Sequence, residues 1–163
     1  MSRALACVLA VWATAAAAGS MVRAFSLQDL YREADGVVLG TVESSRSFWN
    51  DAHDTIYTEY EVAVDRTVKG SEVKRVTVRL MGGRVADREL VVSGNPDIAD
   101  RERLLLFLRD SGEFRTVVGM SQGKWSVRTL DGQELAWRGP QLGNVPKRDG
   151  EVPVEELLRR CRP

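Results

Sequence analysis

The chain has 163 residues, and its 23 basic side chains are balanced by 23 acidic ones. This length suits a single domain, and the balance excludes the basic excess that attracts proteins to nucleic acid or anionic lipid. We therefore expect no nucleic-acid partner.

The first 24 residues are typical of an export signal. Arg3 supplies a positive charge, residues 4–18 form an uncharged, Ala-rich run, and residues 22–24 offer small side chains before a cleavage site, with residues 16–18 as an earlier alternative. The run is shorter than the about 20 apolar residues of a membrane span. We predict a secreted or periplasmic protein that starts near Phe25 and keeps no stable membrane span.

Cysteine usage follows from this cleavage. Cys7 leaves with the signal, so Cys161 is the one cysteine of the mature chain, and an intramolecular disulfide is excluded. The core must then form by burial of apolar side chains. We expect Cys161 to be a free thiol in a frayed C-terminal tail, with a disulfide between two chains as the alternative.

A short helix and a first strand are predicted after the signal. Ser26 can cap the helix, Asp29 lies in its first turn where the helix dipole favours negative charge, and Gly36 can end it. Residues 37–42 form a β-rich run that predicts a central strand. Residues 44–55 are polar, and we expect a loop there.

Residues 56–68 show the clearest strand pattern, because apolar and polar side chains alternate from Ile56 onward. The alternation changes phase late in the run, which predicts a bulge near Asp65-Arg66. A third strand is expected over residues 76–80. Residues 84–92 are interpreted as a further short strand, followed by a turn at Ser93-Gly94-Asn95-Pro96.

The C-terminal part continues with strands and ends in a helix. Residues 104–108 are all apolar, as expected for a strand covered on both faces, and Asp131-Gly132 is a strong hairpin signal. The remaining predicted segments are strands at 114–118, 125–129 and 134–137, a Pro- and Gly-rich linker at 139–150, and a helix at 154–160.

These elements predict a mainly β protein. Five principal strands in antiparallel order favour a small, closed or partly closed OB-fold-like barrel of five to eight strands, with short N- and C-terminal helices. A β-sandwich is the alternative. The predicted organisation is a signal at residues 1–24, the barrel domain at 25–138, and a linker with a short helix at 139–163.

The stretch Gly119-Met120-Ser121-Gln122-Gly123 matches G-x-S-x-G, the turn that presents a nucleophilic serine in many hydrolases. Such an elbow needs a helix after the serine, but the residues that follow predict a strand and a hairpin. The one base candidate, His53, precedes Ser121, which is the reverse of the α/β-hydrolase order. We interpret the motif as a turn and keep a small serine hydrolase using Ser121 and His53 as an alternative.

Other polar clusters do not predict a metal site or an acid–base pair. Asp51, His53 and Asp54 are a poor ligand set for a structural metal, and we interpret them as a solvated loop. Glu59 and Glu61 share one strand face, which we expect to be exposed. We therefore predict no metal and no cofactor.

Three tryptophans admit two interpretations. Trp49, Trp125 and Trp137 could form a stacking surface for a carbohydrate or another oligomer, as on some OB-folds. Packing in the core or at its edge is the interpretation that we favour. We expect the Lys124 side chain to extend from its turn to water.

Several segments between residues 34 and 127 form a familiar succession: residues 35–42, 60–64, 68–70, 93–96, 105–108 and 117–124. This succession resembles uncharacterised bacterial secreted proteins with a netrin-like, or tissue-inhibitor-of-metalloproteinases-like, OB-fold domain. The resemblance implies a binding or inhibitory module outside the cytoplasm that works beside a secreted metalloprotease.

One feature of the animal inhibitors is missing. They bring a cysteine at the mature N-terminus to the protease zinc, and the mature chain here would begin near Phe25 without one. No functional residue is therefore carried over, and the candidate binding residues are Gln122, Lys124 and Trp125, in and beside the Gln-Gly-Lys turn.

The sequence thus predicts an exported, non-enzymatic module that binds a secreted protease or another exported protein. Two alternatives stay open. One is the serine hydrolase, and the other is a carbohydrate- or oligomer-binding OB-type domain.

Overall fold

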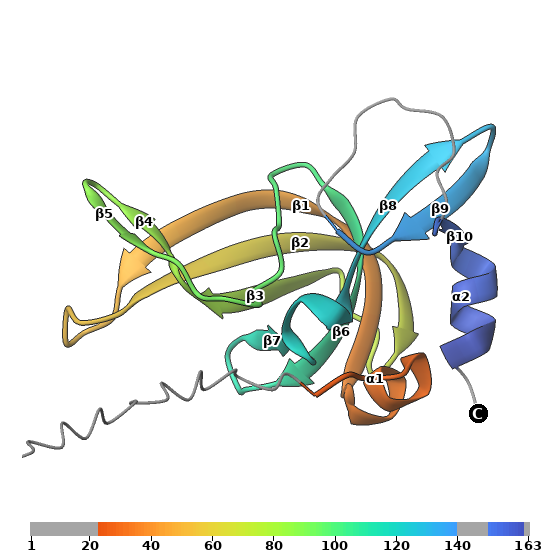
Figure 1. Cartoon of the computed structure of the whole chain (residues 1–163), viewed down its shortest axis with the longest axis horizontal. Helices are drawn as coiled ribbons and strands as arrows, with labels where there is room; N and C mark the ends of the chain where they lie inside the picture. Colours follow the sequence, from red (N-terminus) through yellow and green to blue (C-terminus); the bar gives the residue numbers. More distant parts are fainter. Residues whose placement is uncertain (1–22, 140–149, 162–163) are drawn as a thin grey trace, which may run out of the picture.

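The computed structural model describes residues 23–139 and 150–161 (Figure 1). All but the last two residues of the predicted export signal lie outside the described residues, as does most of the predicted linker. Among the described residues, no helix is long and apolar enough to cross a membrane.

The described residues form short helices at both ends and a series of strands between them. In chain order the elements are α1 (Leu27–Glu33), β1 (Gly36–Trp49), β2 (Ile56–Lys69), β3 (Arg75–Met81), β4 (Gly83–Val85), β5 (Arg88–Leu90), β6 (Arg103–Asp110), β7 (Arg115–Val117), the 3-10 turn η1 (Met120–Gly123), β8 (Lys124–Leu130), β9 (Gln133–Trp137), β10 (Val152–Pro153) and α2 (Val154–Cys161).

Five strands close into a barrel in the order β1-β2-β3-β7-β6, with β6 pairing back to β1. The predicted fold is confirmed: the protein is mainly β, with a small OB-fold-like barrel and short N- and C-terminal helices. One pairing differs from the antiparallel order, because β3 and β7 are parallel, with Val78 opposite Arg115. A closed ring with an odd number of strands cannot alternate direction throughout, so one parallel pair is unavoidable.

Strand β6 shares one of its edges between two partners. Near its C-terminal end Leu108 lies opposite Val117 of β7, and near its N-terminal end Leu104 lies opposite Ser126 of β8. The chain leaves the sheet between these two pairings through η1. Strands β8, β9 and β10 then extend beyond the barrel, where α2 packs beside them (Figure 1).

The side chains of β6 also separate the two hydrophobic cores. Leu104, Leu106 and Leu108 belong to the core of the barrel interior, whereas Leu105 and Phe107 belong to a second core. This second core lies between the sheet and the two helices. The prediction that both faces of this strand are covered is confirmed.

The predicted bulge in β2 is present. Leu39 of β1 lies opposite Arg66, but the next residue, Gly40, lies opposite Val64, so Asp65 has no partner in the ladder. The late change of phase in the alternation of β2 therefore reflects an extra residue in the strand.

The predicted loop at residues 44–55 is wrong over its first half. Strand β1 continues to Trp49, and its residues from Ser44 onward pair with the start of β2. Their polarity reflects exposure on the long β1–β2 hairpin rather than an absence of strand structure. Only the short turn that follows is irregular, and Asn50 stabilises it by accepting hydrogen bonds from Asp54 N and Thr55 N.

The N-terminal helix begins as predicted and ends earlier. Ser26 and Asp29 form a reciprocal capping box, but the helix stops at Glu33 because Ala34 is already extended and Gly36 starts β1.

The predicted C-terminal helix is present and Cys161 is a free thiol, but the expected frayed tail around it is wrong. Helix α2 extends to Cys161, which is only 1% exposed and packs in the core with Leu157, Leu158 and residues of α1. Burial raises the pKa of the Cys161 thiol to about 11. A thiol in this position does not fit a frayed tail, and it does not fit a disulfide between two chains. Cys161 is buried because it lies on the apolar face of α2, which packs into the core.

Candidate functional site

The G-x-S-x-G sequence forms the connection between β7 and β8 rather than a catalytic elbow. Ser121 is exposed in η1, and strand β8 starts at Lys124, so the expectation of a strand after the serine is confirmed. His53 lies in the β1–β2 turn and stacks on Trp49, with ring centroids 6.2 Å apart. Figure 1 shows this turn at the far end of the β1–β2 hairpin, away from η1. The structure does not bring Ser121 and His53 together.

This connection instead holds two distant segments in place. Ser121 N donates a hydrogen bond to Gly94 O at 2.9 Å. The Gln122 side chain binds the segment before α1, because its Oε1 accepts from Phe25 N at 2.8 Å and its Nε2 donates to Arg23 O at 2.9 Å. Gln122, a candidate binding residue, therefore binds this chain's own N-terminal segment.

The end of η1 leaves no room for a side chain. A Cβ atom on Gly123 would lie 2.1 Å from Val118 O, far inside any normal contact. Gly119 begins the same turn in the left-handed conformation, with φ of 65°, which favours glycine. We call residues 119–124 the connecting turn. Both of its glycines are explained by the geometry of the turn.

Lys124 is the last residue of the connecting turn. It forms a buried ion pair with Glu102. The two side chains are 3% and 1% exposed, and Lys124 Nζ lies 2.5 Å from Glu102 Oε1. Ser126 Oγ lies 2.8 Å from this ammonium and 2.6 Å from the carboxylate, and Ala99 N donates to Glu102 Oε2 at 3.0 Å. The expectation that Lys124 extends to water is wrong, because Glu102, just before β6, offers it a buried carboxylate.

A lysine next to a serine can activate the hydroxyl as a nucleophile in some enzymes. Here Ser126 is fully buried, and its hydroxyl is shared between Glu102 and the carbonyl oxygen of Gly139, 3.0 Å away. No substrate can reach the hydroxyl in this arrangement. We assign the cluster a structural role.

Two of the three tryptophans pack as the favoured interpretation expects. Trp125 and Trp137 are buried, Trp125 in the core beside the helices, and the guanidinium of Arg138 lies 4.7 Å from the centroid of the Trp125 ring. Trp49 is half-buried at the other end of the molecule, beside His53. The tryptophans therefore do not form one stacking surface, and Trp125 lies in the core.

The polar residues of the β1–β2 turn stabilise the turn itself. Asp54 accepts hydrogen bonds from Asn50 Nδ2 at 2.8 Å and Thr55 Oγ1 at 2.9 Å, and these bonds lower the pKa of its carboxyl group. Asp51 and His53 are exposed. Across the described part of the chain, no three His, Cys, Asp or Glu side chains gather to form a metal site.

Glu59 and Glu61 are half-buried rather than on an open face. Glu59 accepts hydrogen bonds from Arg79 Nε and Nη2 at 2.9 and 2.5 Å, and Glu61 accepts one from Thr77 Oγ1 at 2.7 Å. The expectation of an exposed pair is wrong, because the neighbouring strand β3 supplies both partners. Each carboxylate belongs to a cross-strand contact.

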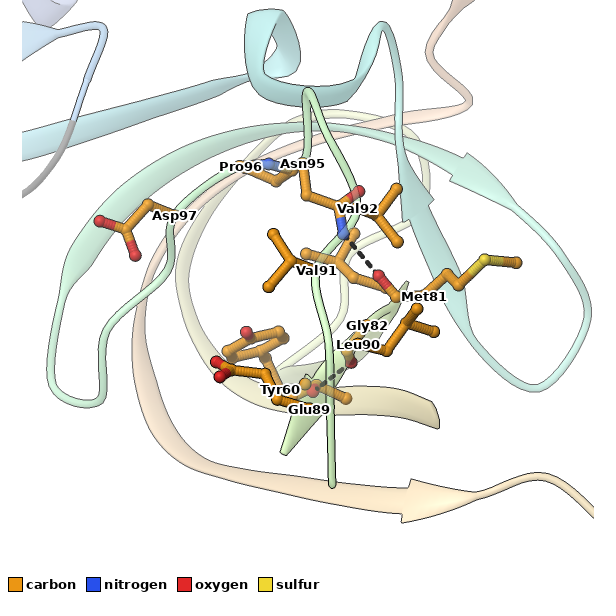
Figure 2. A pocket seen from close by; sticks show the side chains of 13 residues that line it. Tyr60, Met81, Gly82, Glu89, Leu90, Val91, Val92, Asn95, Pro96 and Asp97 are labelled. Carbon is orange, nitrogen blue, oxygen red and sulfur yellow. Dashed lines mark hydrogen bonds between the residues drawn. The ribbon is translucent and has the colours of Figure 1, made fainter. Parts of the chain in front are cut away.

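The described surface also contains an open pocket of about 250 Å³ beside the end of β3 (Figure 2). Its walls come from β2, the end of β3, the β4–β5 hairpin and residues 91–97. The sequence predicts one strand over residues 84–92, but two short strands form there because the chain turns at Ala86, which has a φ of 52°. The hairpin projects away from the barrel sheet and forms one wall of the pocket.

Three hydrogen bonds fix the walls of this pocket. Asn95 Nδ2 donates to Met81 O, Thr58 Oγ1 donates to Gly82 O at 2.7 Å, and the Ser121 backbone holds the turn before Asn95. Gly83 allows the chain to leave β3 here, since a Cβ atom on it would lie 2.1 Å from Thr58 Oγ1. These hydrogen bonds join the walls of the pocket to one another.

The edge of the pocket exposes large apolar side chains. Val91 is 80% exposed and Met81 is 46% exposed. Among the described residues, the other exposed large apolar side chain is Val73, at 38%, and it lies away from this pocket. Two of these three exposed side chains therefore gather at one place.

The charged side chains that line the pocket are acidic. Glu89 and Asp97 contribute carboxylates, and no described lining residue is a lysine, arginine or histidine. Burial raises the pKa of the Tyr60 phenol, and the negative charges of Asp97 and Asp100 raise it further. We call Met81, Glu89, Val91 and Asp97 the pocket rim. It combines apolar surface with negative charge.

The sequence interpretation missed the pocket rim. The available signal was the run Leu90-Val91-Val92, three consecutive apolar residues next to a turn and outside any alternating pattern. The sequence pattern instead predicts the end of a strand for this run. Comparison with protein-family models and with curated proteins gives no match, so the geometry of the site carries the interpretation.

Proposed function

We propose that the protein is an exported, non-enzymatic module that binds another protein through the pocket beside β3. The observation that carries this proposal is the exposure of Val91 and Met81 at the rim of a shaped pocket. An exposed apolar cluster next to polar groups is the usual mark of a protein interaction site. Covering Val91 alone would remove most of its side chain from water.

The rigidity of the pocket supports the same function. Asn95 and Ser121 hold the wall from two sides, so a partner would not have to order it on binding. A pocket that is already ordered loses less conformational entropy when it binds. Ser121 supports this wall through its backbone N–H, which donates to Gly94 O.

A secreted metalloprotease is the first partner class to examine, because the resemblance to the inhibitor-like OB-fold proteins suggests it. The mature chain lacks the N-terminal cysteine of the animal inhibitors. A protease would therefore contact the pocket rim rather than meet its zinc through that route.

Affinity capture from the exported fraction of the producing cell tests the proposal. Tagged protein is compared with Val91→Ser, and with Val73→Ser as a matched control of the same residue type at an exposed position away from the pocket. We expect a stoichiometric partner that the wild type and Val73→Ser retain and Val91→Ser loses. If the partner is a protease, the protein should slow its turnover at near-equimolar ratios. Equal capture by all three proteins would contradict binding at the pocket.

A further inference from the structure

We propose that the segment bound in the pocket is a polypeptide stretch that carries a lysine or arginine next to an apolar side chain. This inference rests on the proposed function and specifies its partner. It follows from the distribution of charge and apolar surface around the pocket.

The apolar side chain that we propose for the bound segment follows from one side of the pocket. In Figure 2, Met81 extends on the side opposite Tyr60, with Val91 between them. Val91 is largely exposed and Met81 is nearly half exposed, so a partner side chain placed there gains free energy by removing their surface from water. A Leu, Ile, Met or Phe side chain has the matching character.

The Lys or Arg that we propose for the bound segment follows from the opposite side of the pocket. In Figure 2, Tyr60 and Glu89 lie together on that side of the view, and Asp97 lies on the same side but apart from them. Asp97 has no ion-pair or hydrogen-bond partner for its carboxylate among the described residues, whereas Glu89 shares its charge with the exposed Arg84 at 2.7 Å. Asp97 is therefore the carboxylate with most to gain from an incoming cation.

The described lining residues of the pocket include no basic side chain, so the negative charge of Asp97 is not balanced within the pocket. Most acidic side chains on the other strands form an ion pair with an arginine, as Glu59 does with Arg79. At the pocket, the charges of Asp97 and the nearby Asp100 both raise the pKa of Tyr60, and the described lining residues include no arginine. A ligand with a guanidinium or ammonium group supplies the missing charge.

A polypeptide fits better than a small cation because the two requirements lie on opposite sides. A small cation beside Asp97 would leave Val91 and Met81 exposed, so it would use only half of the site. Two adjacent side chains of one chain can satisfy both, as in other modes of peptide recognition that combine a pocket with a charge contact.

Selection from a phage-displayed library of random heptapeptides on the purified protein tests this inference. We expect enriched sequences to place Lys or Arg within two positions of a large apolar residue. The affinity of a synthetic peptide of the best sequence is then measured against variants. Val91→Ser should weaken it about tenfold, and the double variant Glu89→Gln/Asp97→Asn about fivefold at low salt, with a smaller effect at high salt.

Two matched controls should bind like the wild type. Val73→Ser removes an exposed valine elsewhere, and Asp131→Asn removes an exposed carboxylate at the β8–β9 turn, at the other end of the molecule (Figure 1). Asp131 has a φ of 49°, a conformation that asparagine also tolerates. These variants separate an effect of the pocket from a general loss of charge or apolar surface.

The outcomes distinguish this inference from the proposed function. Enriched peptides that depend on Val91 but show no preference for Lys or Arg would overturn the partner chemistry and leave the proposed function standing. Peptides that bind every variant equally, or no enrichment over the Val91→Ser protein, would overturn both. If n-butylguanidinium binds as tightly as the peptide, the ligand is a small cation and the polypeptide inference is wrong.

Discussion

The connecting turn and the pocket rim are neighbours with opposite character. In the connecting turn, Lys124 has a buried carboxylate partner, Gln122 has both halves of its amide bonded, and Gly123 has no free space. At the pocket rim, Val91 faces solvent and Asp97 has no partner within the described chain.

The two regions differ in whether their side chains are used within the fold. The turn carries the sequence that resembles a catalytic motif, yet each of its distinctive residues is used to hold the fold. The pocket rim has no recognisable motif, yet it leaves the Val91 side chain exposed and the Asp97 carboxylate without a partner among the described residues. Changes in the turn should therefore reduce stability, and changes in the rim should reduce binding.

The largest effect is expected for Lys124→Met. This change leaves Glu102 as an unpaired charge in the interior and should lower the free energy of unfolding by about 3–5 kcal/mol. Urea unfolding measures the loss. The double variant Lys124→Met/Glu102→Leu removes both charges and should recover much of it. A single variant within about 1 kcal/mol of the wild type would show that the pair is less important than its burial suggests.

The next effect depends on pH and concerns the core beside the connecting turn. Well below pH 9 the Cys161 thiol is protonated in both the folded and the unfolded chain. Because its pKa is about 11 when folded, the unfolded chain loses the proton first, and stability falls as the pH rises from 9 to 11, by about 2–3 kcal/mol in total. Chemical unfolding at several pH values should show this fall.

Cys161→Ala serves as the reference for that measurement. It should lose the part of the alkaline fall that the thiol causes, while other groups titrate as before. Parallel pH profiles for the two proteins would mean that the thiol is more accessible than the structure shows.

Gly123→Ala tests the fit of the connecting turn directly. The new Cβ atom would meet Val118 O, and we expect a loss of about 2–3 kcal/mol in thermal or urea unfolding. Gly132→Ala is the matched control, because its turn has a φ of 77° but open space around it, and it should cost about 1 kcal/mol. Gly123 does not have a positive φ, so a loss no larger than that of Gly132→Ala would show that the space around Gly123 is less restricted than its distance to Val118 O indicates.

The smallest effect on stability is expected at the pocket rim. Val91→Ser and Asp97→Asn should change the free energy of unfolding by less than about 0.5 kcal/mol, because neither side chain has a partner to lose. The same variants should reduce partner capture. A large loss of stability at either position would remove the contrast between the two regions.

Much of the fold was predictable because its strands carry strong local patterns. The alternation from Ile56 onward indicated β2 and its bulge, and the apolar run at residues 104–108 indicated a strand covered on both sides. The polar half of β1 was missed, since a strand on an exposed hairpin has no apolar face to reveal it. The parallel pair of β3 and β7 depends on how the ring closes, which no local pattern encodes.

The site was less predictable because its contacts join residues that are distant in sequence. Lys124 and Glu102 are 22 positions apart, and Gln122 reaches Arg23 across 99 positions. The burial of Cys161 likewise depends on α1, at the opposite end of the chain. The turn at residues 93–96 and the connecting turn both belonged to the resemblance, but their contact through Ser121 and Gly94 appears only in three dimensions.

Strand β6 has a consequence for the chain before it folds. Residues 104–108 form an uninterrupted apolar segment, the kind of sequence that stacks against copies of itself in aggregates. Charged residues flank it on both sides, Arg101-Glu102-Arg103 before it and Arg109-Asp110 after it, and such flanks oppose this stacking. Glu102 therefore acts twice, first by keeping unfolded chains apart and later, once buried, as the partner of Lys124.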